Sequence, residues 1–166
     1  MIQQAVASDD PIVFMEPKRR YWDTSHVGAE ALPLHASQLV NEGRDATLVT
    51  YGPMVRTCLE SAEAAREDGV DLDVVDLRSL SPLDLDPVHA SVRRTGRAIV
   101  VHEASRTLGL GAEIAARVQE ECFHSLEAPV LRVTGYDLPY PPSRVEDEFL
   151  PDLDRVLDAV DRSMAF

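Results

Sequence analysis

Cysteine is nearly absent from this chain, which has only Cys58 and Cys122. Two thiols cannot form the dense disulfide framework of a small secreted domain, so we expect a reducing compartment, the cytoplasm. Each cysteine falls on the apolar side of an expected helix, and we interpret both as small core residues.

Long apolar runs are also lacking. No stretch approaches the roughly 20 apolar residues that a membrane span needs. The opening MIQQAVASDDP has neither the cationic start nor the apolar segment of a secretion signal. We therefore expect a soluble protein that does not bind membranes.

Basic residues are few: the chain has 16 lysines and arginines against 29 aspartates and glutamates. Its net charge is therefore -13. A field of this sign repels phosphate, so nucleic acids and anionic membranes are not expected partners. A protein with a basic surface suits the chain better. Residues 146–161 carry many of the acids; they read either as a solvated helix face or as a docking site for such a partner.

The first 45 residues show little periodicity. The apolar run IVFM at residues 12–15 predicts a short strand that Glu16 and Pro17 end. Residues 17–45 have no sustained pattern, and unstructured stretches of that length are uncommon inside a compact domain. We therefore interpret them as a crossing between domains.

From Ala46 onward, short β-branched runs alternate with amphipathic segments. The runs predict strands at residues 46–52, 70–78, 97–103 and 129–135. Helices are expected after Pro53, before Gly96, over residues 110–125 and after Pro151. Such alternation is typical of an α/β fold, a three-layer α/β/α sandwich on a mostly parallel sheet.

His102 and Glu103 end the third of these strands, and ligands of parallel sheets bind beyond the carboxyl ends of strands. Neither residue has an evident catalytic or metal-binding partner in the sequence, so we interpret the pair as structural. The following LGLG lacks the third glycine of a dinucleotide fingerprint and the Lys-Ser/Thr of a P-loop. A tight turn is favoured there, and a nucleotide site stays open. The other histidines, scattered along the chain, are expected in loops or on the surface: His26, His35, His89 and His124.

Seven segments together carry a family resemblance that covers nearly the whole chain in order. They are PIVFMEPKRRYW, ATLVTYG, VVDLRSLSPLDLD, GRAIVVHEA, GLGAEIAARVQEECF, LEAPVLRVTGYDLPYP and DEFLPDLDRVLDAV. The chain resembles the carboxyl-terminal part of the β subunit of thiamine-diphosphate-dependent 2-oxo acid dehydrogenases. The segment EECFHSLEAPVLRVTGYDLPYP is most similar to the branched-chain (2-oxoisovalerate) enzymes, although pyruvate and acetoin dehydrogenases share much of the pattern. One departure is Leu108, where related chains often carry glycine.

The resemblance implies a division into three parts. Residues 1–15 would be a remnant of the preceding pyrimidine-binding domain, residues 16–45 the interdomain linker, and residues 46–166 a transketolase C-terminal-like domain. Thiamine diphosphate and magnesium would belong to the intact heterotetramer of two α and two β subunits, and this fragment would bind neither. No residue here matches the family's catalytic groups, so the resemblance implies no catalytic, cofactor-binding or metal-binding residue and an inactive isolated fragment.

What the resemblance leaves to this domain is assembly. Its partners would be the α subunit, the second β subunit and the small basic subunit-binding domain of the lipoyl acyltransferase core. By match of position, Glu127 and the terminal carboxylate of Phe166 are the expected partner-binding groups. A stand-alone docking module for a basic partner is the alternative. The substrate pocket would lie elsewhere, so the 2-oxo acid is left open.

Overall fold

The computed structural model describes residues 1–24 and 32–166. The described residues contain a five-stranded sheet of order β1-β3-β2-β4-β5. Its strands are β1 (Gln38–Asn41), β2 (Ala46–Thr50), β3 (Leu72–Asp76), β4 (Ala98–Ser105) and β5 (Leu131–Gly135). Only β1 runs antiparallel to its neighbour, β3, and the other three pairings are parallel. The predicted mostly parallel sheet is confirmed.

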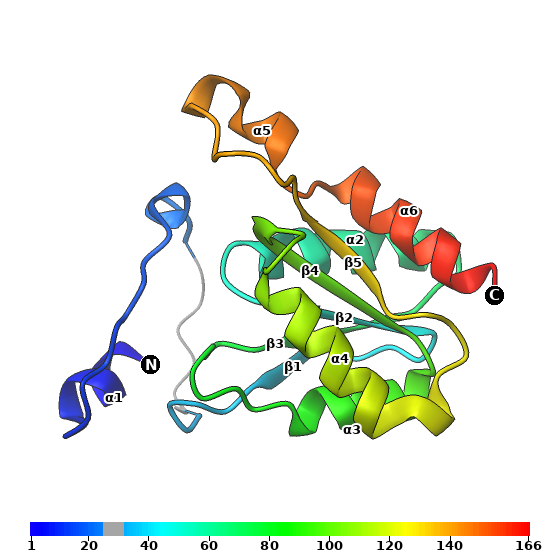
Figure 1. Ribbon diagram of the computed structural model, residues 1–166, viewed down its shortest axis with the longest axis horizontal. Coiled ribbons are helices and arrows are strands. Elements are labelled where there is room, and N and C mark those ends of the chain that lie inside the picture. The colour runs from blue at the N-terminus through cyan, green and yellow to red at the C-terminus, as the bar shows by residue number, and fades with distance from the viewer. Residues whose placement is uncertain (25–31) are drawn as a thin grey trace.

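Helices cover both faces of the sheet (Figure 1). On one face lie α2 (Met54–Glu67) and α6 (Leu153–Met164); on the other lie α3 (Asp86–Thr95) and α4 (Leu110–Cys122). The three-layer α/β/α sandwich predicted from the sequence is therefore confirmed.

Strand β2 shows why the strands of this sheet lack the alternation of apolar and polar residues seen in half-exposed strands. All five of its residues are buried. Leu48 packs in the core that α2 and α6 close, while its neighbour Val49 packs in the core that α3 and α4 close. A strand covered on both faces needs apolar side chains at successive positions, because successive side chains point to opposite faces.

The helix boundaries follow the expected stop signals. Pro53 precedes α2, and Gly96 ends α3 with φ 71°, donating its N–H to Val92 O at 2.9 Å. Glycine adopts this left-handed conformation without the steric cost that other residues incur. Cys58 and Cys122 are buried and free, as predicted.

The amino-terminal arm consists of α1 (Ile2–Ala7) and a short 3-10 turn, η1 (Lys18–Arg20), and neither element has a buried residue. The predicted strand at residues 12–15 is wrong for the described chain, which forms no strand there. Val13 and Met15 remain 89% and 84% exposed. A β-strand is stable only when it pairs with another, and the described residues supply no partner to this run.

Strand β1 lies inside the segment 16–45 that the sequence reads as a linker. It is short and at the edge of the sheet, and its first two residues, Gln38 and Leu39, are exposed. A half-exposed edge strand has a weak hydrophobic pattern, so periodicity misses it. Residues 25–31 of the expected linker, with His26, lie outside the described residues, and the division at 15 and 45 stays a prediction.

Ionic contacts hold the arm against the sheet domain. Arg19 pairs with Glu146 at 3.5 Å and Asp147 at 2.8 Å. Both acids belong to α5 (Glu146–Phe149), which follows the 3-10 turn η3 (Ser143–Val145). Arg20 donates to Pro53 O at 2.9 Å. The contact between arm and domain is therefore largely polar.

Candidate functional site

The predicted partner-binding residue Glu127 lies in the loop before β5. Its backbone N–H donates to Gly96 O at 2.8 Å, and its carboxylate accepts a hydrogen bond from Arg97 Nη1 at 2.5 Å. The Arg97 side chain is only 15% exposed, whereas that of Glu127 is 63% exposed. The Glu127 carboxylate is thus held by the largely buried Arg97, while most of the Glu127 side chain stays exposed.

The same guanidinium also contacts the last turn of α6, near the end of the chain. Arg97 Nε donates to Ser163 O at 3.1 Å, in the last turn of α6. Two residues beyond that helix, Phe166 is 72% exposed. Arg97 therefore brings together the Glu127 loop and the carboxyl-terminal segment that contains Phe166.

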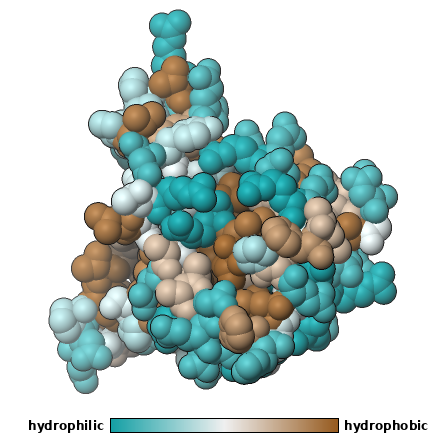
Figure 2. All heavy atoms as spheres, turned by 45° about the vertical axis from the view of Figure 1, so that its right-hand side comes forward, coloured by the Kyte–Doolittle hydropathy of each residue, from teal (hydrophilic) through white to brown (hydrophobic). Residues whose placement is uncertain are grey.

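The acidic residues of segment 146–161 do not lie together on one surface. Glu146 and Asp147 on α5 pair with Arg19, and α5 lies at the opposite end of α6 from the carboxyl terminus (Figure 1). Asp158 and Asp161 lie in the second half of α6, nearer to Phe166. Hydrophilic side chains cover most of the face in Figure 2, with smaller apolar patches between them. Asp158 pairs with Arg162 at 3.6 Å, so of these two acids only Asp161 forms no ion pair within the described residues.

His102 is fully buried beneath the start of α4. Its Nε2 accepts a hydrogen bond from the Gly111 N–H at 3.1 Å, and its ring stacks on Tyr51 with centroids 5.9 Å apart. Burial, with the nearby Arg132 charge, lowers the pKa of His102 below its usual 6.5. The neutral ring serves as a cap for one of the unpaired N–H groups of a helix start, which is a structural role.

The LGLG turn is shaped by close approach to this histidine. A Cβ at Gly111 would lie 2.3 Å from His102 Nε2, and a Cβ at Gly109 would lie 2.1 Å from Ser105 O. The two glycines are therefore explained by packing of helix start against strand, as the tight-turn interpretation expects. Leu108 adopts φ 61° and is 98% exposed, a conformation that costs a non-glycine residue about 1 kcal/mol.

Glu103 points into a mixed cluster at the ends of the strands. Burial raises its pKa, while Arg19 opposes this and Glu146 adds to it. The Tyr140 hydroxyl donates to Glu146, and burial together with that bond raises the pKa of Tyr140 to about 12. Of these groups only Arg19 comes from the arm, where it pairs with Glu146, so the cluster is a polar contact between arm and domain.

The remaining sequence candidates do not come together. His35 bonds Ser79 Oγ at 3.1 Å, and His124 is exposed beside Phe123. His89, expected in a loop or on the surface, is instead buried within α3 at 8% exposure, and its backbone carbonyl accepts from Cys122 Sγ at 3.7 Å. Within residues 1–24 and 32–166 no three metal-ligating side chains gather, and no helix is long and apolar enough to cross a membrane.

Two features escaped the sequence interpretation. The first is Arg97, which reads as an ordinary first residue of a strand. The second is Asp73, fully buried on β3, which accepts from Gly43 N at 2.7 Å and from Arg94 Nη2 at 2.6 Å, and also from Ser91. A charged residue within an otherwise apolar strand was the available signal, since buried carboxylates require partners.

Comparison with known families identifies one clear match. The family described as "Transketolase, C-terminal domain" matches residues 35–156. The match begins just before β1, in agreement with the sheet of the structure.

The curated relatives align with nearly all of this chain, but the chain covers only part of each relative's length. The chain is 53% identical over its whole length to the pyruvate dehydrogenase E1 component subunit beta of Leifsonia xyli, of which it covers 50%. It is 48% identical over 98% of its length to the 3-methyl-2-oxobutanoate dehydrogenase subunit beta of Mycobacterium tuberculosis, of which it covers 47%. The chain thus spans about half the length of the curated relatives that it matches.

A solved structure titled "Split gene transketolase, inactive beta4 tetramer" has the same fold. It superposes with a TM-score of 0.70 at 25% identity, over 86% of this chain and 46% of that one. The topology described above is therefore shared with an independently solved protein.

Proposed function

Because the chain belongs to the family of transketolase C-terminal domains, we propose that it is the assembly domain of a 2-oxo acid dehydrogenase β subunit. The intact enzyme would decarboxylate a branched-chain 2-oxo acid oxidatively and pass the acyl group to lipoyl groups of an acyltransferase core. One observation carries this proposal. The whole chain matches about half of β subunits of this enzyme class, at 48 to 53% identity.

The branched-chain substrate is the finer part of the proposal. The segment before and through β5 supports it by resemblance, whereas the 53% identical relative is a pyruvate dehydrogenase subunit. The intact enzyme, assayed with 2-oxoisovalerate and with pyruvate, should give the higher kcat/KM with 2-oxoisovalerate. The reverse order would assign the chain to the pyruvate branch and leave the domain assignment unchanged.

Thiamine diphosphate and magnesium would be bound only in the intact enzyme. Among the described residues no three metal-ligating side chains lie together. In this proposal both groups are held by other parts of the α and β subunits. No chemical step is assigned to a residue of this chain.

The docking role rests on the surface around Glu127 and Phe166. Arg97 orders the Glu127 carboxylate and links it to the last turn of α6, which carries Asp161. A small basic domain fits such a surface, because opposed charges steer encounter and fix orientation. The proposed occupant is the subunit-binding domain of the acyltransferase core.

The test is titration calorimetry of the reconstituted α/β enzyme with that subunit-binding domain. Glu127→Lys should weaken binding by at least about tenfold, because a cation then faces a basic partner. Glu127→Gln should weaken it less. Glu120→Lys, on the exposed side of α4, is the matched control for net charge. Unchanged affinity for Glu127→Lys, with an unchanged melting temperature, would refute the docking site.

A stand-alone docking module is the second candidate. The exposed apolar side chains of the arm, Val13, Met15 and Trp22, speak against it, since an uncovered apolar arm is a liability in a free protein. An antibody against this chain decides between the two in extracts of the source cells. A band about twice the 18.3 kDa of the chain supports the β subunit, and a band at 18.3 kDa supports the module.

A further inference from the structure

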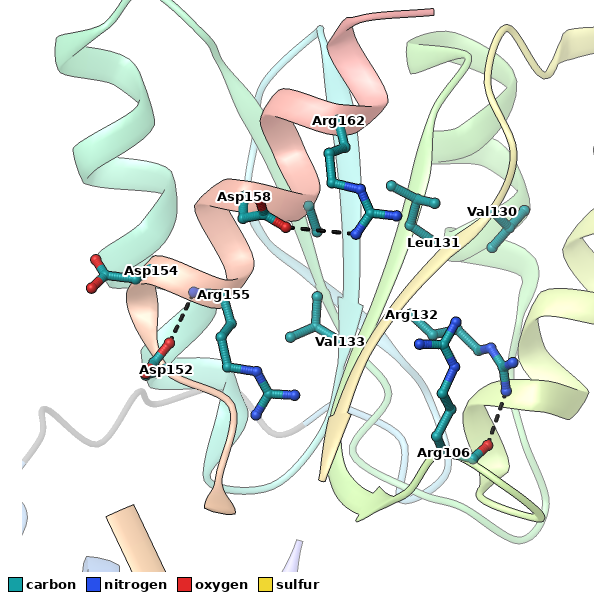
Figure 3. Close-up of a pocket in the computed structure, with 11 residues that line it drawn as sticks. Arg106, Val130, Leu131, Arg132, Val133, Asp152, Asp154, Arg155, Asp158 and Arg162 are labelled. Carbon is teal, nitrogen blue, oxygen red and sulfur yellow. Dashed lines mark hydrogen bonds and ion pairs between the residues drawn. The ribbon is translucent and has the colours of Figure 1, made fainter. Parts of the chain in front are cut away.

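A groove lies along the outer edge of the sheet, between β5 and α6 (Figure 3). Its volume is about 460 Å³, and its apolar floor includes Leu131, Val133 and Ala159. Strand β5 is last in the sheet order and pairs only with β4 among the described residues. The backbone groups on its other side therefore face the groove without a partner strand.

Four arginines line this groove: Arg106, Arg132, Arg155 and Arg162. Of these four arginines, only Arg162 forms an ion pair within the described part of the chain, with Asp158 at 3.6 Å. Of the other acids on the α6 wall, Asp152 accepts the Arg155 backbone N–H and Asp154 points away from the groove. In a chain of net charge -13, the lining of this groove is net positive, with four arginines against three aspartates.

The arginines occupy both sides of β5. Arg155 and Arg162 come from α6, whereas Arg132 and Arg106 lie together on the other side of the strand (Figure 3). Arg132 Nη1 donates to Arg106 O at 3.0 Å, so these two side chains are held close despite their like charges. Leu131 and Val133 face the α6 side, where they pack in the same core as Val156.

We propose that this groove binds an extended, acidic segment of another polypeptide, which adds as a strand to the free edge of β5. Consecutive side chains of an added strand point to opposite faces, so two adjacent acidic residues would reach Arg162 on one side of β5 and Arg106 with Arg132 on the other. The backbone would pair along Leu131 to Val133. Arg155 closes the far end, since its Nη2 donates to Thr134 O at 2.5 Å and its guanidinium stacks on Tyr136 at 4.7 Å.

Charge selects against two other occupants. A second copy pairing β5 edge to edge would place its own Arg132 and Arg106 against the same arginines, and like charges across paired strands are destabilising. A basic domain is repelled for the same reason. The proposed contacts do not use the Glu127 carboxylate, so the inference does not depend on the docking role proposed there.

The experiment uses the native protein, in whatever assembly it purifies. The probe is a fluorescein-labelled twelve-residue peptide of Val, Thr and Glu with two adjacent glutamates at its centre. Fluorescence anisotropy should show saturable binding that weakens as salt rises, and hydrogen exchange should show protection of the amides of residues 130–135. A matched peptide with Gln for Glu should bind at least about tenfold more weakly.

Protein variants locate the site. Arg132→Gln and Arg162→Gln should each weaken peptide binding several-fold, while Arg144→Gln, on η3 outside the groove, should not change it. A peptide that keeps the central glutamates but has proline at the two positions flanking them should lose binding if a strand is added, because proline removes the backbone donor. Equal binding of the Gln peptide or the proline peptide would overturn the proposal, as would absence of binding or of protection at β5. Binding of a second copy of the protein in place of the peptide would also overturn it.

Discussion

The guanidinium of Arg97 joins Glu127 to Ser163, so that one largely buried cation connects the loop before β5 with the last turn of α6. Neither neighbour is close to Arg97 in sequence. The contact orders the two segments that carry the proposed partner-binding groups, and it does so through two different nitrogen atoms of one planar group. Lysine has a single nitrogen and cannot reproduce that geometry.

Arg97→Lys should therefore destabilise the protein although it keeps the charge. We expect a loss of about 1 kcal/mol in the free energy of unfolding, because one of the two hydrogen bonds is lost. Urea denaturation followed by circular dichroism measures this. Arg93→Lys, an exposed arginine on α3, is the control and should change stability by less than about 0.5 kcal/mol. Equal stability of Arg97→Lys and the wild type would mean that the bridge contributes nothing.

Gly111→Ala should destabilise the protein although alanine is the better helix former. Its methyl group would meet His102 Nε2 at 2.3 Å, and overpacking of this kind costs about 1 to 3 kcal/mol. Adding His102→Ala removes the obstacle, so the double variant should lose less stability than the sum of the two single variants. Simple additivity in thermal or urea unfolding would contradict the assigned contact.

The pKa of His102 sets a pH dependence of stability. Its folded-state pKa lies below 6.5, mainly through burial, so below pH 6.5 the unfolded chain binds more protons than the folded one. The stabilisation by the neutral ring is full above pH 6.5 and should be lost as pH falls below it. Urea midpoints of the wild type and His102→Asn, compared from pH 8 to pH 5, should converge toward acid. Parallel curves would show that His102 does not titrate differently on folding.

Asp73 is expected to be a major stabilising residue of the sheet. It binds the Gly43 N–H from the β1–β2 loop and both Ser91 and Arg94 from α3, while Ser91 Oγ also contacts Thr47 Oγ1 at 2.7 Å. Asp73→Ala leaves these partners without their acceptor and should cost about 3 kcal/mol or more. Glu60→Ala removes an acid from the exposed Arg56 pair and should cost under about 1 kcal/mol in the same urea assay. Similar losses for the two variants would contradict the role of Asp73.

The sheet strands β2 to β5 and their helices could be predicted from the sequence because their pattern is local. Doubly covered strands are rich in apolar and β-branched residues on both faces, and Gly96 marks the end of α3 by a conformation that glycine favours. Residues 12–15 and β1 could not be predicted. Whether an apolar run becomes a strand depends on a partner elsewhere in the chain, and β1 has one in β3 whereas residues 12–15 have none among the described residues.

Some residues of the candidate sites could likewise be predicted from the sequence, and others could not. The sequence pointed to Glu127 and Phe166 through resemblance, to His102 through its place at a strand end, and to a basic partner through net charge. It did not reveal Arg97, whose two acceptors lie 30 and 66 positions further along the chain. Nor did it reveal the arginine groove, because Arg106, Arg132 and Arg162 belong to three separate segments.

The sequence by itself therefore determined the fold class, the helix ends and the family, because these depend on residue order, local conformational preference and the spacing of apolar side chains. The tertiary structure alone decided which polar groups meet. It buried Asp73 among its partners, made His102 the cap of α4 and left the edge of β5 open beside four arginines. Charges and hydrogen bonds act over a few ångströms in space, whatever the separation of the residues along the chain.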